Sequence, residues 1–172
     1  AIGYQALVAN EDGASNIAIG KNALATNVDG DRQTAVGENA LRYSEPSGGS
    51  GRNTAFGYRA GFYVSTGGNN VFIGSSAGQG ITGTRLTGSS NTALGYQAGL
   101  LLQGAAHSNT YIGDSSGDVT TTGVENTCLG YNTDIQDATA TNQIVIGNNL
   151  TGTADNAVHI GNDSSHIRCD FN

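Results

Sequence analysis

The chain has 172 residues, of which 37% are hydrophobic and 12% are charged, and it contains 27 glycines but no Trp or Met. The net charge of −7, without a cluster of Lys or Arg, argues against a nucleic-acid partner. No apolar stretch approaches the roughly twenty residues that cross a bilayer, so no membrane insertion is expected. With so few large apolar side chains, a thick globular core is excluded, and a narrow core is favoured.

A glycine that follows an apolar residue recurs along the whole chain. It stands at Gly3, Gly20, Gly37, Gly57, Gly74, Gly95, Gly113, Gly130, Gly147 and Gly161. Intervals of 17 residues are the most frequent among these positions. A period just under twenty is typical of a solenoid, in which each coil buries its apolar face only against its neighbours. We therefore expect residues 1–172 to form one all-β domain, a parallel β-roll or β-solenoid of about ten coils.

Each coil is predicted to contain a short strand that ends just before its glycine. In chain order these strands fall at 17–19, 34–36, 54–56, 71–73, 92–94, 110–112, 127–129, 144–146 and 158–160. Their first and last positions hold Thr or apolar residues, most of them β-branched, which favours strand geometry. Because these two positions lie two residues apart, their side chains share one face of the strand.

The middle position of each strand points to the opposite face and is also uncharged, most often Ala. A strand that is apolar on both faces is typically buried on both faces. We expect one face to pack inside the coil and the Ala-rich face to meet the backbone of an identical chain. This hypothesis places a lengthwise interface between chains at Ala18, Ala35, Ala55, Ala93 and Cys128.

Asparagine and loop residues occupy the rest of each coil. Asn at the strand entrance, as at Asn53 and Asn91, is expected to bond its own turn or to stack in register along the rod. Three coils are longer or less regular than the others, at 44–52, 79–90 and 100–108. Insertions in solenoids form loops, often on a binding face, so these segments are candidate contact regions.

The motif Asn-Thr-Ala-x-Gly-Tyr-x-Ala, which begins at Asn53 and at Asn91, resembles the head repeats of trimeric autotransporter adhesins. It is more similar still to the repeats of phage tail fibres and bacterial surface fibres that precede an endosialidase-type intramolecular chaperone. The resemblance implies an extracellular or virion fibre in which three chains form β-rolls around a threefold axis. The period here is longer than in that family, and no chaperone follows. Since the sequence opens inside a repeat, we expect it to be a piece of a longer fibre protein.

Catalytic and metal chemistry are not expected. His159 and His166, with Asp163 or Asp170, have the residue types of a metal site, but His159 occupies a packing position of the repeat. No Gly-x-Ser-x-Gly motif or convergent set of acid, base and nucleophile is evident. We therefore predict no enzymatic activity, no metal and no cofactor.

Aromatic and polar side chains next to the glycines suggest a ligand surface. Tyrosines that follow the glycine, beside Arg and Asn, suit carbohydrate, the usual target of surface fibres in the resembling family. The predicted contacts are Tyr58, Arg59, Arg85, Tyr96 and His107. The predicted function is a non-enzymatic trimeric fibre segment that attaches to a cell surface by binding glycan. The alternative is a purely structural shaft, in which the tyrosines only cover coil edges.

Overall fold

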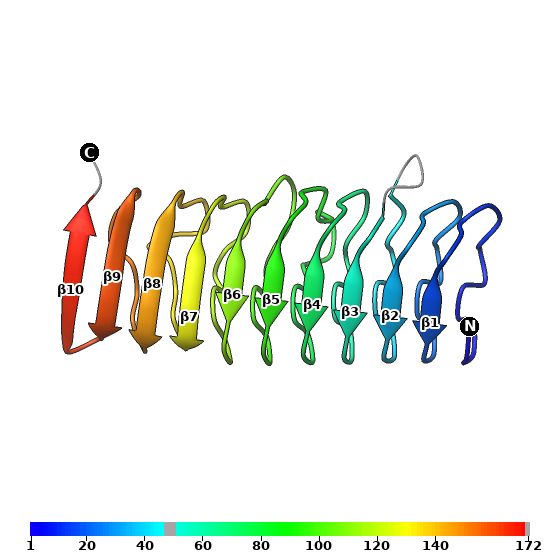
Figure 1. Ribbon diagram of the computed structural model, residues 1–172, viewed down its shortest axis with the longest axis horizontal. Coiled ribbons are helices and arrows are strands. Elements are labelled where there is room, and N and C mark those ends of the chain that lie inside the picture. Colours follow the sequence, from blue (N-terminus) through cyan, green and yellow to red (C-terminus); the bar gives the residue numbers. More distant parts are fainter. Residues whose placement is uncertain (47–50, 171–172) are drawn as a thin grey trace.

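The chain forms a single elongated β-solenoid in a computed structural model that describes residues 1–46 and 51–170. Figure 1 shows the coils stacked along the long axis, with the two termini at opposite ends. The strands are β1 (Ile17–Ile19), β2 (Thr34–Val36), β3 (Thr54–Phe56), β4 (Val71–Ile73), β5 (Thr92–Leu94), β6 (Thr110–Ile112), β7 (Thr127–Tyr131), β8 (Gln143–Asn148), β9 (Ala157–Asn162) and β10 (Ser165–Asp170). No helix occurs in the two described ranges. The predicted all-β parallel solenoid is thus confirmed.

All ten strands belong to one sheet in sequence order, and β1 to β9 are parallel. Equivalent residues of successive coils are paired, for example Ala18 with Ala35 and Ala35 with Ala55. The solenoid has about eight turns, fewer than the ten expected. At the carboxyl end, β10 turns back and pairs antiparallel with β9. The last repeat therefore closes as a hairpin.

The middle residue of each strand points into the coil. Ala18 is 1% exposed, and Ala35, Ala55, Ala93 and Cys128 are 0% exposed within the single chain. They belong to a narrow core that also contains Ala and Leu from the turns after each glycine. The structure corrects the expectation that these five side chains face a partner chain. The same inward position holds Phe72 in β4 and Tyr111 in β6, both 0% exposed, and there glycines of the turns, Gly78 and Gly117, lie against the large ring.

The residues on either side of the middle position face outward. One apolar side chain per coil, directly before the glycine, forms a row that we call the outer stripe: Ile19, Val36, Phe56, Ile73, Leu94, Ile112, Leu129, Ile146 and Ile160. Phe56, Leu94 and Leu129 are among its exposed members, at 57%, 42% and 42%. Since the strand alternates, burial of the Ala face leaves this apolar row in solvent.

The recurring glycine allows consecutive coils to approach closely where each strand ends. Gly57 has φ +135, and a Cβ added there would lie 2.6 Å from the carbonyl oxygen of Gly74. A side chain at this position would meet both a strained backbone and a steric clash. The glycine period is therefore the period of coil stacking. We call the stacked glycines that end the strands the glycine column.

Buried asparagines form a hydrogen-bonded ladder parallel to the long axis. Both the backbone N–H and Nδ2 of Asn91 donate to Oδ1 of Asn70, at 2.9 and 3.0 Å. Nδ2 of Asn91 also donates to the carbonyl oxygen of Ala106 in the loop, at 2.9 Å. Each Asn side chain thus forms hydrogen bonds with its own loop and with an adjacent coil, which confirms both expected roles.

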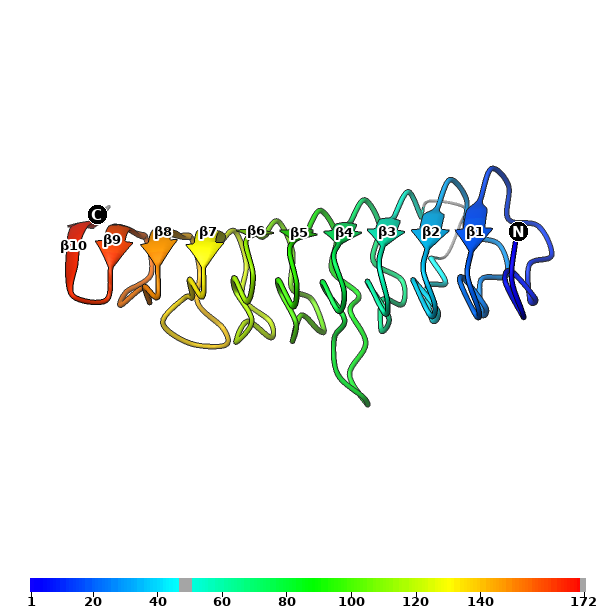
Figure 2. The same cartoon turned by 90° about the horizontal axis from the view of Figure 1, so that it is seen from below.

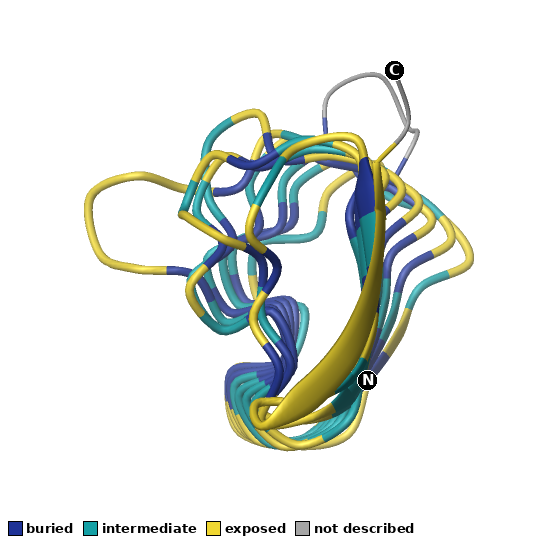
Figure 3. Cartoon of the chain, turned by 90° about the vertical axis from the view of Figure 1, so that its left-hand side faces the viewer, coloured by how far each residue is buried: buried dark blue, intermediate teal, exposed yellow. Residues whose placement is uncertain are grey.

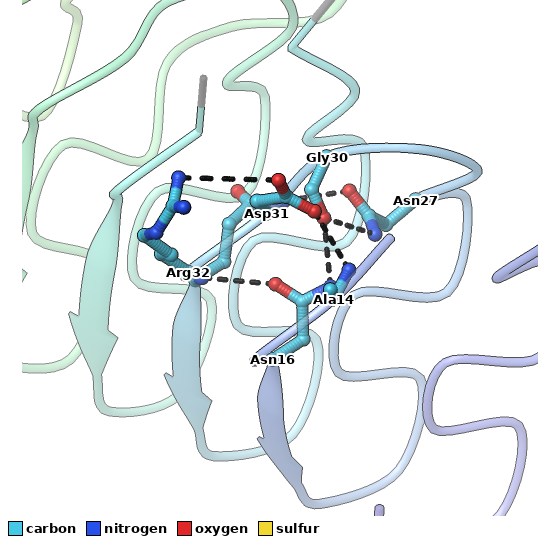
Figure 4. A network of polar contacts seen from close by, with 7 residues as sticks. Ala14, Asn16, Asn27, Gly30, Asp31 and Arg32 are labelled. Carbon is cyan, nitrogen blue, oxygen red and sulfur yellow. Dashed lines mark hydrogen bonds and ion pairs between the residues drawn. The ribbon is translucent and has the colours of Figure 1, made fainter. Parts of the chain in front are cut away.

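The same arrangement begins in the first coils (Figure 4). Nδ2 of Asn16 and Nδ2 of Asn27 both donate to the carbonyl oxygen of Gly30, at 2.7 and 3.0 Å. The N–H of Ala14 donates to Oδ1 of Asp31 at 2.7 Å, which ties the turn of one coil to the next.

Candidate functional site

Three aromatic rings from two neighbouring coils pack together outside the glycine column. Tyr43 follows β2, and Phe62 and Tyr63 follow β3 one coil later. The N–H of Tyr43 donates to the carbonyl oxygen of Phe62, at 3.3 Å, which sets the coils in register. The Tyr43 and Tyr63 rings stack with centroids 5.6 Å apart and an interplanar angle of 6°. Phe62 meets both rings edge-on, at 5.2 and 4.6 Å.

Three arginines surround these rings. The Arg42 guanidinium lies 5.3 Å from the centroid of Tyr43, and that of Arg85 lies 4.6 Å from the same centroid. The Arg59 guanidinium lies 5.2 Å from the centroids of both Tyr58 and Phe62. These distances are typical of cation–π contacts. We call the set Arg42, Tyr43, Tyr58, Arg59, Phe62, Tyr63 and Arg85 the arginine–aromatic cluster.

The turn after β3 positions the Arg59 side chain. The N–H of Ala60 donates to the carbonyl oxygen of Gly57, at 3.3 Å, and Arg59 adopts a left-handed φ of 54° within this turn. Gln97 has the same conformation, with φ 54°, at the equivalent position two coils later. The backbone of the repeat, and not the cluster itself, therefore imposes this geometry on Arg59.

A protruding loop brings Arg85 to the rings. The connection from β4 to β5 extends furthest from the body of the solenoid, on the side away from the strands (Figure 2), and Figure 3 shows the same loop standing clear of the stacked coils. Residues Ile81 and Thr84 form an antiparallel bridge within it. The hydroxyl groups of Tyr63 and Thr82 are hydrogen-bonded at 2.8 Å, which anchors the loop to the coil below.

The cluster concentrates unpaired positive charge in an acidic protein. It holds three of the seven basic residues, whereas the chain has 14 Asp and Glu. Within residues 1–46 and 51–170, the ion pairs are Lys21–Glu38, Arg32–Asp31 and Arg168–Asp170, none of which involves the cluster. Arg42 donates weakly to Oδ1 of Asn39, at 3.4 Å, and the buried Nε of Arg59 has no hydrogen-bond partner. The three guanidinium groups thus retain most of their donors.

The structure gathers three of the five predicted ligand residues into the cluster, namely Tyr58, Arg59 and Arg85. Tyr96 lies after β5 with its side chain 53% exposed. His107 lies in the following loop, where its Nδ1 is 3.2 Å from Oγ of Ser108. No contact links either residue to the cluster among the described residues.

Sequence reasoning missed Arg42, Tyr43, Phe62 and Tyr63. The signal was present, because Tyr43 and Tyr63 are separated by 20 residues, as are Gly37 and Gly57. Residues one local period apart lie in adjacent coils, so the two tyrosines had to be neighbours. The inserted loop that carries Arg85 does not follow the repeat spacing, so the position of Arg85 relative to the glycines does not give its neighbours.

A second feature is a polar hollow of about 420 Å³ at the carboxyl end, lined by Asn148, Asn149, Asn162, Asp163 and Ser164. The hairpin turn uses one of its acceptors. Oδ1 of Asn162 accepts the N–H groups of Ser164 and Ser165, each at 2.9 Å. The lining of this hollow contains no Arg or Lys, so it lacks the positive charge of the cluster.

The histidines do not assemble the metal site considered from the sequence. The rings of His159 and His166 lie 6.0 Å apart, and Nε2 of His159 is 3.0 Å from Oγ1 of Thr153. Burial lowers the pKa of His159, and the nearby charges of Arg168 and His166 lower it further. No group of three or more His, Cys, Asp or Glu side chains with metal-binding geometry occurs in the described part of the chain.

Two carboxyl groups of adjacent coils interact. Burial is the main cause that raises the pKa of Asp134, and a hydrogen bond with the Asp118 carboxyl and its negative charge add to the effect. Oδ1 of Asp134 also accepts the N–H of Val119 at 3.4 Å. This pair makes stability depend on pH.

Comparisons with protein-family models, curated proteins and solved structures find no match. Over the described ranges, no helix has the length and apolarity to cross a membrane.

Proposed function

We propose that this chain is a non-enzymatic segment of a trimeric extracellular fibre, on a cell surface or a virion, that attaches to a cell envelope by binding glycan. The arginine–aromatic cluster carries the proposal. A shaft requires only the regular repeat, whereas the cluster combines side chains from two coils with an inserted loop. Its exposed aromatic side chains, Tyr58 above all, offer apolar contact for a sugar, and its guanidinium groups offer hydrogen-bond donors.

The outer stripe supports self-association. An apolar row that is exposed in coil after coil is a surface that proteins normally cover. A second and third copy of the chain present the same row with the same spacing, so a symmetric homotrimer would bury it along its length. The proposed interface therefore runs through Phe56, Ile73 and Leu94, and not through the buried Ala face.

Light scattering at micromolar concentration tests the trimer. We expect a mass of three chains for the natural sequence and a smaller mass for Phe56→Glu, because a charge would be buried in the interface. Val8→Glu is the matched control, since Val8 is 63% exposed and lies outside the outer stripe. A stable monomer of the natural chain contradicts this part of the proposal.

A glycan array with the purified protein tests attachment. We expect binding that is lost when Tyr58, Arg59 and Arg85 are all replaced by Ala. The control replaces Tyr96 and His107, which lie outside the cluster. Binding that survives the triple change would contradict the site, and failure to bind any glycan or envelope extract would contradict the attachment function.

The alternative function is a structural shaft, and the regularity of the coils favours it. Strand register is unbroken from β1 to β9, and the asparagine ladder links successive coils. Such a rod holds a fixed length without any ligand. The shaft function remains the better description if the protein binds no glycan or envelope extract.

A further inference from the structure

We propose that the arginine–aromatic cluster binds a carboxylate-bearing saccharide, with the carboxylate held by Arg42 and Arg85 and the sugar ring packed on the aromatic faces. This proposal rests on the proposed glycan-binding function and specifies the chemical class of the ligand.

The first argument is the convergence of like charges. Arg42 and Arg85 approach the same ring, that of Tyr43, at 5.3 and 4.6 Å. Arg42 also lies 5.9 Å from the centroid of Phe62, which Arg59 approaches to 5.2 Å. Each such contact holds a guanidinium against a ring, while neighbouring cations repel one another. A bound anion would turn this repulsion into attraction.

The second argument is that the protein supplies no such anion itself. Of the two acidic side chains nearest to Arg42 in sequence, Glu45 makes no ion pair among the described residues. Glu38 pairs with Lys21 at 3.7 Å and accepts Nδ2 of Asn39 at 3.4 Å. Oδ1 of Asn39 in turn faces Nη1 of Arg42 at 3.4 Å. An amide thus separates Arg42 from the only carboxylate that the contacts place beside it, and its remaining N–H groups are free for a ligand.

The third argument is geometric. A guanidinium group presents parallel N–H donors that match the two oxygens of a carboxylate, which a point charge such as Lys does not. The Tyr43 and Tyr63 rings stack on each other with an interplanar angle of 6°, so their uncovered parts, together with the 46% exposed Tyr58, form the apolar surface beside those donors. A saccharide that carries a carboxylate has both an apolar ring face, which fits the aromatic side chains, and a planar anion, which fits the guanidinium groups.

The loop that carries Arg85 leaves the site open to solvent. Arg85, Thr84 and Gly83 are exposed, and a Cβ added at Gly83 would meet nothing within 4 Å. The loop tip therefore leaves space for a ligand, while the Tyr63–Thr82 bond and the bond from the N–H of Gly104 to the carbonyl oxygen of Arg85 hold its base. In a trimer the site would occur three times, which strengthens attachment to a multivalent surface even if each contact is weak.

Isothermal titration calorimetry with an oligomer of galacturonic acid tests the inference. We expect binding in the micromolar to millimolar range that weakens with added salt. The methyl ester and the matched neutral galactose oligomer should bind at least tenfold more weakly. Equal binding of acidic and neutral oligomers would overturn the inference while leaving glycan attachment intact.

Variants locate the site. Arg42→Gln combined with Arg85→Gln should weaken binding of the acidic oligomer at least tenfold, while Arg52→Gln, an exposed arginine outside the cluster, should not. Unchanged circular dichroism and melting temperature show that the variants fold. Binding that survives the double change overturns the assignment, as does equally tight binding of a sulfated oligomer, because charge alone would then suffice. Binding of the acidic oligomer without binding to any envelope extract would support the site and contradict the attachment function.

Discussion

At the scale of single residues, the glycine column is the most constrained part of the chain. Gly57→Ala should destabilise the protein by several kcal/mol, since the added Cβ lies 2.6 Å from the Gly74 carbonyl oxygen and φ is +135°. Gly104→Ala is the control. Its φ is +53° and the nearest atom to its Cβ is 3.4 Å away, so a cost of only about 1–2 kcal/mol is expected. Urea unfolding measures both, and equal losses would refute the steric explanation.

Asp134 should make stability fall as pH rises. Burial and the neighbouring Asp118 raise the pKa of Asp134 to about 8, whereas an unfolded Asp titrates near 3.9. The folded chain therefore holds a proton that the unfolded chain has lost, and stability declines from about pH 4 to about pH 8. Asp134→Asn should raise the melting temperature at pH 8, with a smaller gain near pH 4. Asp118→Asn should also flatten the dependence of the melting temperature on pH. The same pH dependence for the natural chain and both variants would contradict this assignment.

At the scale of elements, the sequence predicted where the strands lie but not which face is inside. Thr, Ile and Val before each glycine marked the strands, because the alternation that identifies a strand can be read from a few neighbouring residues. Both faces of that pattern are apolar, so the pattern alone does not say which face the turns cover. Leu24 and Leu41 settle it, because these turn residues are buried in the same core cluster as the middle residues of the strands.

Because the Ala face lies inside the coil and not at a chain interface, the expected effect of a charge at Ala55 changes. Ala55→Glu places an unpaired carboxylate in a core position that is 0% exposed, so it should prevent folding of the chain itself rather than only its assembly. Thr54→Glu, at the outward-facing neighbour, should keep the strand content. Circular dichroism and thermal unfolding compare the two, and a folded monomer of Ala55→Glu would contradict the observed orientation.

The candidate site was predictable only in part, for a related reason. Tyr58 and Arg59 stand next to a glycine, so their place in the coil follows from the repeat. The partners Tyr43 and Tyr63 follow from the local period of 20 residues. The contact of Arg85 with Tyr43 depends instead on how the loop between β4 and β5 folds, which no periodic signal encodes.

At the scale of the whole molecule, each coil is an exchangeable unit. Deletion of residues 110–126 joins Asn109 to Thr127, and these residues occupy consecutive positions of the repeat. The shortened chain should remain folded, because register and ladder are restored across the junction and coils contact only their neighbours. Deletion of residues 110–118 removes half a coil and should abolish the cooperative unfolding transition. Similar stability of the two deletions would show that register is not decisive.

The direction of the strands also determines how the rod responds to force. The strands run across the long axis in Figure 1, so the hydrogen bonds between coils lie along it. Tension applied to the two ends therefore loads one inter-coil ladder at a time, as in peeling, rather than many ladders in shear. Each 17-residue coil that opens would release roughly 55 Å of chain, at about 3.3 Å per extended residue. A rod of this kind yields stepwise under load, and it absorbs work before its far end is released.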